Sequence, residues 1–171
     1  MKKNRNSPWH AALFGAALGL SGLTGGLGLA QAAIDTGSPV GTWKTIDDET
    51  GKAKSLVEIT ESNGQLHGRI VKLFNPSKPN PICEKCEGGK KDQPINGMEI
   101  LWGLRKSGSE WAGGQVLDPQ KGKVYDAKVA LADNGSKLNL RGYIGFSLLG
   151  RTQTWLRETD PAAATDSTRT P

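Results

Sequence analysis

Two cysteines, Cys83 and Cys86, are the residues of this chain best suited to covalent or metal chemistry. They stand at C-x-x-C spacing, which serves redox catalysis, half of a zinc site or a disulfide. A redox pair needs a helix N-terminus, whose dipole lowers the thiol pKa, but the flanks NPSKPNPI and EGGKKDQP disfavour a helix. A zinc site needs two further ligands, and His67 is the only histidine after His10. The choice among the three therefore depends on the compartment and on the surrounding loop.

The N-terminus has the features of a signal peptide. A basic start, MKKNR, precedes about twenty small and apolar residues, and Ala30-Gln31-Ala32 matches the small-x-small pattern that signal peptidase cleaves. A membrane-spanning anchor is the alternative, which the many glycines of the segment disfavour. We expect residues 1–32 to be a signal peptide cleaved after Ala32, leaving a periplasmic or secreted protein with no lipid anchor or other stable membrane anchor.

An oxidising compartment favours a disulfide between Cys83 and Cys86. The pair lies in a connection, residues 75–97, that contains four prolines and no strand pattern. Connections of this length in compact domains are usually functional or disordered, and the prolines and the disulfide argue against disorder. We expect an ordered flap over the open end of the fold; a surface loop without function is the alternative.

No other group of residues forms a recognisable catalytic site. Asp118 precedes a proline and is expected to cap its own turn. Glu99, Glu110 and Asp126 have no partner at acid–base spacing, and Ser147 lacks the G-x-S-x-G motif. The stretch GGQVLDPQKGK is not a phosphate-binding Walker sequence. We expect no catalytic residue, no enzyme activity, no metal and no cofactor.

Charge and length limit the remaining possibilities. Removal of the signal peptide lowers the formal net charge from +5 to +2, with 19 basic against 17 acidic residues. This balance, without an arginine-rich or zinc-finger pattern, gives no reason to expect a nucleic-acid partner. Residues 159–171 lack apolar periodicity and are predicted to be a disordered tail. A single domain is therefore expected over residues 33–158.

Short alternating runs of apolar and polar residues predict an all-β fold. Most of the runs are separated by tight connections such as SNG, SGS and DNGS, which are typical of hairpins. We predict an eight-stranded up-and-down antiparallel barrel, because closure removes the exposed edges of such a meander. A β-sandwich is disfavoured because only residues 75–97 offer a long crossover. The predicted strands are residues 41–46, 54–61, 65–74, 98–107, 110–118, 123–132, 137–146 and 150–158.

The two-residue period also predicts which side chains face inward. In the fourth run it groups Trp102 with Ile100 and Leu104, and in the seventh it continues from Leu138 through Phe146. In the last run the pattern leaves open whether Trp155 or Leu156 faces inward.

An eight-stranded barrel is wide enough to be filled by side chains or to hold one small ligand. The stretch GFSLLGRTQTW, residues 145–155, is the densest candidate, because Arg151 and Gln153 offer polar groups beside aromatic rings. The alternative is that Arg151 pairs with a surface acid and the glycines form a tight hairpin. The residues predicted to bind a ligand are Trp102, Tyr125, Tyr143, Phe146, Arg151 and Trp155.

Several motifs, taken together and in order, resemble one family. They are GTWKT, CEKC, GGQVLDPQKGKVYDAKV and LRGYIGFSLLGRTQTWLR. The family is an exported bacterial one, catalogued as a domain of unknown function (number two-one-four-seven), and the resemblance covers about Gly41 to Glu158. It implies a small periplasmic β-barrel similar to lipocalins and fatty-acid-binding proteins, and it implies no defined activity.

The likeness to lipocalins has a local counterpart. Lipocalins begin their first strand with G-x-W, and an arginine of the last strand packs over that indole at the closed end. Gly41-Thr42-Trp43 matches the first element, and Arg157 is the best-placed partner. A planar cation stacked on an electron-rich ring would close the base of the barrel. We expect Trp43 and Arg157 to have structural roles.

The function expected from these observations is binding of a small apolar or amphipathic ligand inside an exported barrel, with residues 75–97 controlling entry. The alternative is an envelope protein–protein interaction module with a filled barrel, which docks its protein partner through the same loop.

Overall fold

A computed structural model describes residues 35–159 of the chain. The predicted signal peptide, and the predicted tail beyond Thr159, lie outside the described residues. Two short 3₁₀ turns, η1 (Gly88–Lys90) and η2 (Asp133–Gly135), accompany eight strands. The strands are β1 (Gly41–Ile46), β2 (Ala53–Ser62), β3 (Gln65–Leu73), β4 (Glu99–Ser107), β5 (Glu110–Asp118), β6 (Lys123–Ala132), β7 (Lys137–Tyr143) and β8 (Gly150–Arg157).

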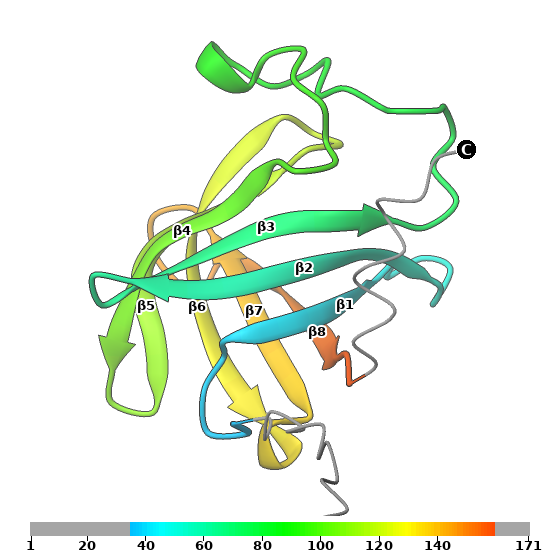
Figure 1. Ribbon diagram of the computed structural model, residues 1–171. Helices are drawn as coiled ribbons and strands as arrows, with labels where there is room; N and C mark the ends of the chain where they lie inside the picture. Colours follow the sequence, from blue (N-terminus) through cyan, green and yellow to red (C-terminus); the bar gives the residue numbers. More distant parts are fainter. Residues whose placement is uncertain (1–34, 160–171) are drawn as a thin grey trace, which may run out of the picture. The chain divides into compact units, whose positions relative to one another are not determined.

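The eight strands form one closed antiparallel barrel in which each strand pairs with its neighbours in the chain (Figure 1). Closure is made by β1 and β8, where Trp43 lies opposite Arg157 and Lys44 opposite Leu156. The prediction of an eight-stranded up-and-down barrel is confirmed. Among residues 35–159, no helix is long and apolar enough to cross a membrane.

Local turn chemistry explains the meander. Asn63 and Gly64 connect β2 to β3 with φ angles of 53° and 70°. Two positive φ angles in a two-residue connection match the twist of antiparallel strands, and Asn-Gly is the preferred pair for this geometry. The sequence signal SNG therefore fixes the hairpin at this point.

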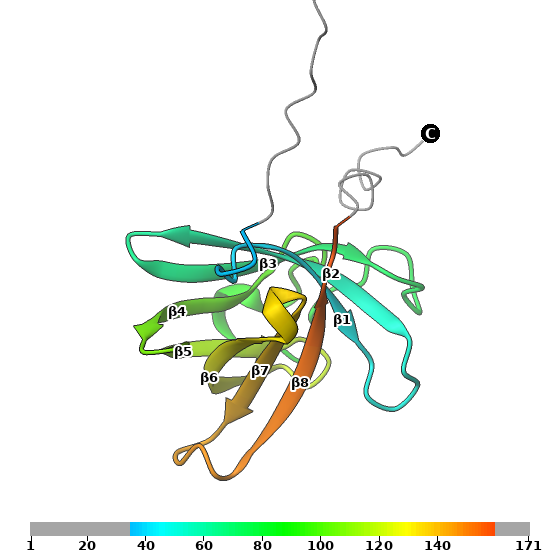
Figure 2. The same cartoon turned by 90° about the horizontal axis from the view of Figure 1, so that it is seen from below.

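The barrel has two different ends. Because adjacent strands are antiparallel, the connections β1–β2, β3–β4, β5–β6 and β7–β8 lie at one end. The other end receives the chain before β1 and releases it after β8, and we call it the closed end (Figure 2). We call the first end the mouth; it comprises residues 47–52, 74–98, 119–122 and 144–149.

The interior near the closed end is filled by large side chains. Trp155 is 2% exposed and Leu156 is 38% exposed, so β8 turns its tryptophan inward, which settles the open alternative. Burial of such side chains is the main stabilising contribution to the fold. The largest members of this group are Trp43, Ile59, Leu66, Leu104, Trp111, Leu138 and Trp155.

The predicted inward face of β4 was wrong in part. Leu101 and Leu104 are fully buried, whereas Trp102 lies opposite the exposed Gln115 and donates from Nε1 to Gln115 Oε1 at 3.2 Å. Trp102 therefore lies on the outer surface. The cause is irregular pairing between β3 and β4 together with Gly103, whose φ is 77°. A bulge shifts the side-chain alternation by one position.

The predicted seventh strand was too long. β7 ends at Tyr143, and residues 144–149 form the connection to β8. Ile144 and Phe146, predicted to continue the inward face, are 70% and 82% exposed. A face assigned by alternation holds only while the strand continues, and the glycines at 145 and 150 end it here.

Candidate functional site at the barrel mouth

The closed end is sealed by the pair predicted to have structural roles. The guanidinium carbon of Arg157 lies 4.2 Å from the centre of the Trp43 ring. Arg157 also donates to the carbonyls of Gly135 (2.6 Å), Val40 (3.0 Å) and Ser38 (2.7 Å). Burial lowers the pKa of Arg157, and the charge of Asp35 opposes that shift. One face of the guanidinium lies on the indole and its edge is bound to three carbonyls, so this end is covered by Arg157, and we expect a ligand to enter from the mouth.

From the mouth toward the closed end, β8 directs three polar groups toward the interior. Arg151, Gln153 and Trp155 are spaced two residues apart, so they share one face of the strand. Their cross-strand partners on β7 are Gly142, Leu140 and Leu138, which belong to the inner wall. The last strand therefore carries a guanidinium, an amide and an indole N–H from the rim of the barrel inward.

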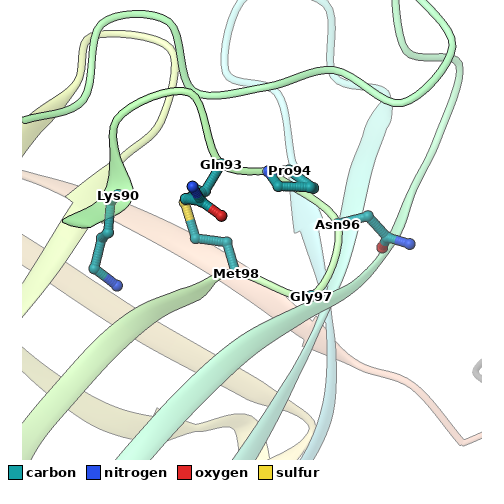
Figure 3. A pocket seen from close by; sticks show the side chains of 6 residues that line it. All are labelled: Lys90, Gln93, Pro94, Asn96, Gly97 and Met98. Atoms are coloured by element: carbon teal, nitrogen blue, oxygen red, sulfur yellow. The ribbon is translucent and has the colours of Figure 1, made fainter.

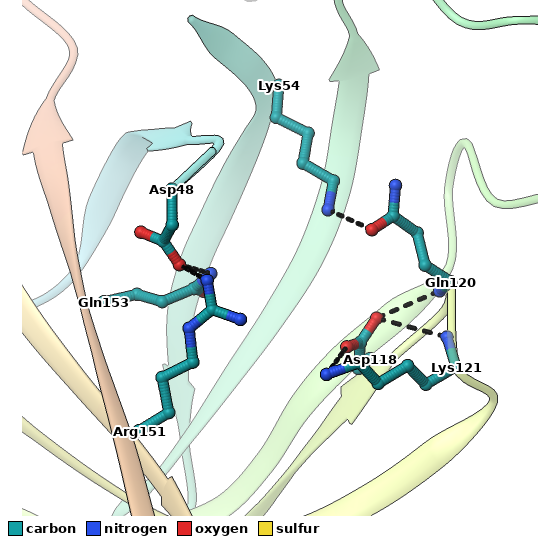
Figure 4. Close-up of polar contacts among 7 residues, drawn as sticks. All are labelled: Asp48, Lys54, Asp118, Gln120, Lys121, Arg151 and Gln153. Atoms are coloured by element: carbon teal, nitrogen blue, oxygen red, sulfur yellow. Dashed lines mark hydrogen bonds and ion pairs between the residues drawn. The ribbon is translucent and has the colours of Figure 1, made fainter. Parts of the chain in front are cut away.

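A carboxylate already occupies the outer two of these groups. Arg151 Nη2 and Gln153 Nε2 both donate to Oδ2 of Asp48, with a distance of 3.0 Å from Gln153 (Figure 4). Asp48 belongs to the β1–β2 turn and lies more than a hundred positions away in the chain. Arg151 and Gln153 are thus arranged to hold one anionic oxygen, and charge-assisted hydrogen bonds of this kind are the strong ones.

The third group on β8 has no such partner. Trp155 Nε1 is buried and makes no hydrogen bond within the described residues. Buried donors in proteins are nearly always paired, with protein groups or with water, and leaving one unpaired costs about 1–3 kcal/mol. Trp155 therefore has a donor available inside the barrel for an acceptor oxygen.

The wall beside β8 is also polar near the mouth. Thr45 and Ser55 face inward from β1 and β2, and their hydroxyl oxygens are 2.7 Å apart. Ser55 N donates to the Thr45 hydroxyl at 3.1 Å. Across the mouth, Lys54 donates to the side-chain oxygen of Gln120 at 2.9 Å, as Figure 4 shows. The mouth is polar at its rim and apolar below.

Of the six residues predicted to bind a ligand, three lie on the inner wall. Arg151 and Trp155 face inward from β8, and Tyr125 on β6 lies beside Gly142, where an added Cβ would be 3.6 Å from that of Tyr125. Gly142 has no side chain and so adds no bulk to this part of the inner wall. A Cβ added there would also contact Val116, at 3.5 Å.

The other three predicted residues lie elsewhere. Trp102 is on the outer surface, and Tyr143 lies opposite the exposed Asp126, also on the outside. Phe146 is in the β7–β8 turn. The sequence analysis missed Asp48, Thr45 and Ser55. Thr45 follows Trp43 by two residues and could have been placed on the same face, but nothing local to Asp48 indicates its partner.

The loop between β3 and β4 is ordered. Cys83 and Cys86 form a disulfide, and both residues are buried. Cys83 exchanges backbone hydrogen bonds with its surroundings, donating to Gln93 O at 2.9 Å and accepting from Asp92 N at 3.1 Å. Its sulfur lies 3.3 Å from the carbonyl oxygen of Pro119 in the β5–β6 turn. The disulfide therefore lies against a neighbouring rim segment.

A pocket of about 290 Å³ lies in this loop (Figure 3). Its one charged group, Lys90, already contacts the Trp102 ring at 4.8 Å. Among the described residues no cluster of histidine, cysteine or acidic side chains could hold a metal ion. The pocket is formed by the loop and not by the barrel interior, because its lining is Lys90, Gln93, Pro94, Asn96, Gly97 and Met98.

A closed antiparallel barrel with a stacked Trp–Arg pair at one end and a polar mouth at the other defines a lipocalin-like protein. The family described as "Uncharacterized protein conserved in bacteria (DUF2147)" matches residues 41–157, and the chain belongs to this family. The resemblance noted in the sequence is confirmed.

One solved structure is similar over the whole barrel. It is described as "Protein HP1028 from the human pathogen Helicobacter pylori belongs to the lipocalin family". The two chains are 22% identical, and the match has a TM-score of 0.65 and covers 78% of this chain and 92% of the other. At this identity the likeness shows the fold. No curated protein matches the chain.

Proposed function

We propose that this chain is an exported protein that binds a small amphipathic acid at the mouth of its barrel. The observation that carries the proposal is the carboxylate of Asp48, held by Arg151 and Gln153 at the rim. Groups that hold one carboxylate in this geometry are suited to hold another from a ligand. An apolar body attached to that head would extend below the rim.

Export is supported by two features. The basic and apolar start of the chain is typical of a signal peptide, and the disulfide between Cys83 and Cys86 is the kind that persists in an oxidising compartment. A periplasmic location follows for a bacterial chain that is cleaved near Ala32.

The ligand is expected to be small. Large side chains fill the closed end, so we place the ligand in the half of the barrel nearer the mouth. Its wall there is made by Ile70, Val116 and Tyr125, with the short side chains of Thr45 and Ser55. Sites of this kind obtain affinity from apolar burial and orientation from a few polar groups. The free N–H of Trp155 would donate a hydrogen bond to an acceptor atom of a molecule that reaches further in.

Asp48 would act as an internal competitor. Its side chain is 34% exposed and that of Arg151 is 61% exposed, and an ion pair this accessible contributes little to stability. A ligand carboxylate can therefore displace it at small cost. Removal of Asp48 should strengthen binding of an acid, whereas removal of Arg151 should weaken it.

Calorimetric titration with decanoate tests the proposal. We expect Arg151→Gln to weaken binding at least tenfold and Asp48→Ala to strengthen it several-fold, while Arg105→Gln, the same change on the exposed end of β4, has no effect. Trp155→Phe keeps the ring and removes the donor, so a loss of about two- to tenfold is expected if an acceptor reaches it. The neutral analogue decanol should respond to none of the charge changes.

Two results would contradict the proposal. The first is wild-type protein that gives no saturable heat with decanoate or with an aromatic carboxylate of similar size. The second is binding that is equally strong in wild type, Arg151→Gln and Asp48→Ala. Either result would favour the filled barrel that serves as an interaction module.

A further inference from the structure

The connection between β7 and β8 exposes an unusual amount of apolar surface. Ile144, Phe146, Leu148 and Leu149 are 70%, 82%, 88% and 77% exposed. Single exposed apolar residues are ordinary, but a contiguous group marks a contact surface. We call these four side chains the apolar turn; the connection that carries them joins β7 to β8, whose hairpin is drawn in gold and orange in Figure 2.

The apolar turn is held in a defined shape. Arg141 on β7 donates from Nε to Ser147 O at 2.6 Å and from Nη2 to Leu148 O at 3.1 Å. Its Nη1 donates to the Thr152 hydroxyl at 3.0 Å, which ties the turn to β8. Leu149 N closes the turn onto Phe146 O at 3.0 Å. An arginine that fixes the backbone beneath exposed apolar side chains keeps them presented to the outside.

The segment that carries the apolar turn is basic, although two acidic residues from other elements, Asp48 beside Arg151 and Asp126 opposite Tyr143, lie near it. From residue 134 to residue 157 the chain contains no aspartate or glutamate, and its basic residues are Lys137, Arg141, Arg151 and Arg157. Arg141 and Arg151 flank the turn on its two sides. Arg151 is paired with Asp48 but its side chain remains 61% exposed. An apolar tip between two arginines is complementary to an anionic lipid surface, where acyl chains receive the apolar groups and the phosphates attract the positive charge beside them.

The size of the surface decides between a bilayer and a protein. A stable protein interface buries roughly 800 Å² on each partner, which four side chains on one narrow turn do not supply. Insertion at a bilayer interface has no such threshold, since each buried apolar side chain adds its own contribution. We infer that the apolar turn docks this protein on an anionic lipid bilayer.

Docking goes beyond the proposed ligand site but bears on its use. Arg151 follows the turn directly and also holds Asp48 at the mouth, so a docked turn would place the mouth next to the lipid surface. A small amphipathic acid dissolved in the bilayer would then reach Arg151 over a short path. The docking itself needs no ligand.

Flotation with lipid vesicles tests the inference. Protein recovered after export, its N-terminus determined by mass spectrometry, is mixed with vesicles of phosphatidylglycerol and phosphatidylcholine in equal parts. We expect the variant Phe146→Ser/Leu148→Ser to bind at least tenfold more weakly than wild type. The control Val40→Ser changes an exposed apolar residue at the closed end, 39% exposed, and should bind as wild type does. Vesicles of pure phosphatidylcholine, or high salt, should also reduce binding.

Equal vesicle binding by wild type and Phe146→Ser/Leu148→Ser would overturn the inference. So would a wild type that ignores vesicles and forms a dimer in sedimentation experiments that the variant does not form, because the turn would then bind a second copy of the chain. Decanoate titration separates the two proposals. Vesicle binding without decanoate binding leaves docking in place and removes the ligand site, and the reverse result removes docking alone.

Discussion

Arg157 lies over the indole of Trp43 at 4.2 Å while its guanidinium donates to three backbone carbonyls. These two residues are also direct cross-strand partners, on the first and last strands. The same contact therefore joins the first and last strands of the barrel and covers its closed end. The acceptors lie in the chain before β1 and in η2, so a single side chain joins three segments.

Replacement of Arg157 should weaken the fold more than any ordinary surface change. Arg157→Ala removes a cation–π contact and leaves three carbonyls without their donor, so a loss of at least about 2 kcal/mol is expected in urea unfolding. Arg157→Lys keeps the charge but not the planar set of donors, and should recover less than half of the loss. Arg105→Ala, on exposed β4, is the control and should cost under about 0.5 kcal/mol. Equal stability of Arg157→Ala and Arg105→Ala would rule out the structural role.

The closed end could be predicted from sequence because its signals are local. G-x-W starts a strand, W-x-R ends one, and the same resemblance that suggested the barrel paired them. The tight hairpins were equally accessible, since Asn63-Gly64 dictates its own backbone geometry. Alternation also placed Leu138 and Leu140 on the buried inner wall.

The mouth could be predicted only in part because its contacts are long-range. Arg151 and Trp155 were identified from residue type and position, but the partner of Arg151, Asp48, comes from a turn that is more than a hundred positions away in the sequence. No local pattern links two such residues. The error at Trp102 has another cause. The side-chain alternation of β4 shifts at Gly103 because of the way β3 and β4 pair, and the sequence of one strand does not reveal how it is aligned with its neighbour.

The buried hydroxyl pair at the mouth should contribute unequally to stability. Thr45 Oγ1 contacts the Ser55 hydroxyl at 2.7 Å and accepts from Ser55 N at 3.1 Å. Thr45→Val removes the partner of both groups and should cost about 1–3 kcal/mol. Ser55→Ala leaves Thr45 Oγ1 with the Ser55 backbone and should cost clearly less. Urea unfolding of both variants measures the difference; a larger loss for Ser55→Ala would show that the hydrogen bonds are assigned wrongly.

The attachment of the loop to the rim depends on Gly122. A Cβ added there would lie 1.8 Å from the carbonyl oxygen of Lys85, so the disulfide-containing loop between β3 and β4 would have to move. Gly122 also has a φ of 67°, where alanine is disfavoured. Gly51 is a matched control, because its φ is 68° and nothing lies within 4 Å of an added Cβ.

We expect Gly51→Ala to cost about 1–2 kcal/mol through its backbone alone and Gly122→Ala to cost about 1–3 kcal/mol more through the clash. Limited trypsin digestion reports where the difference lies. In Gly122→Ala the released loop should be cut first after Lys85, Lys90 or Lys91, whereas in Gly51→Ala these sites should stay as resistant as in wild type. If both variants lose the same stability and the loop stays protected in both, the loop does not depend on the β5–β6 turn. The expectation that this loop is an ordered cover of the mouth would then lose its main support, because the disulfide by itself joins residues only three positions apart.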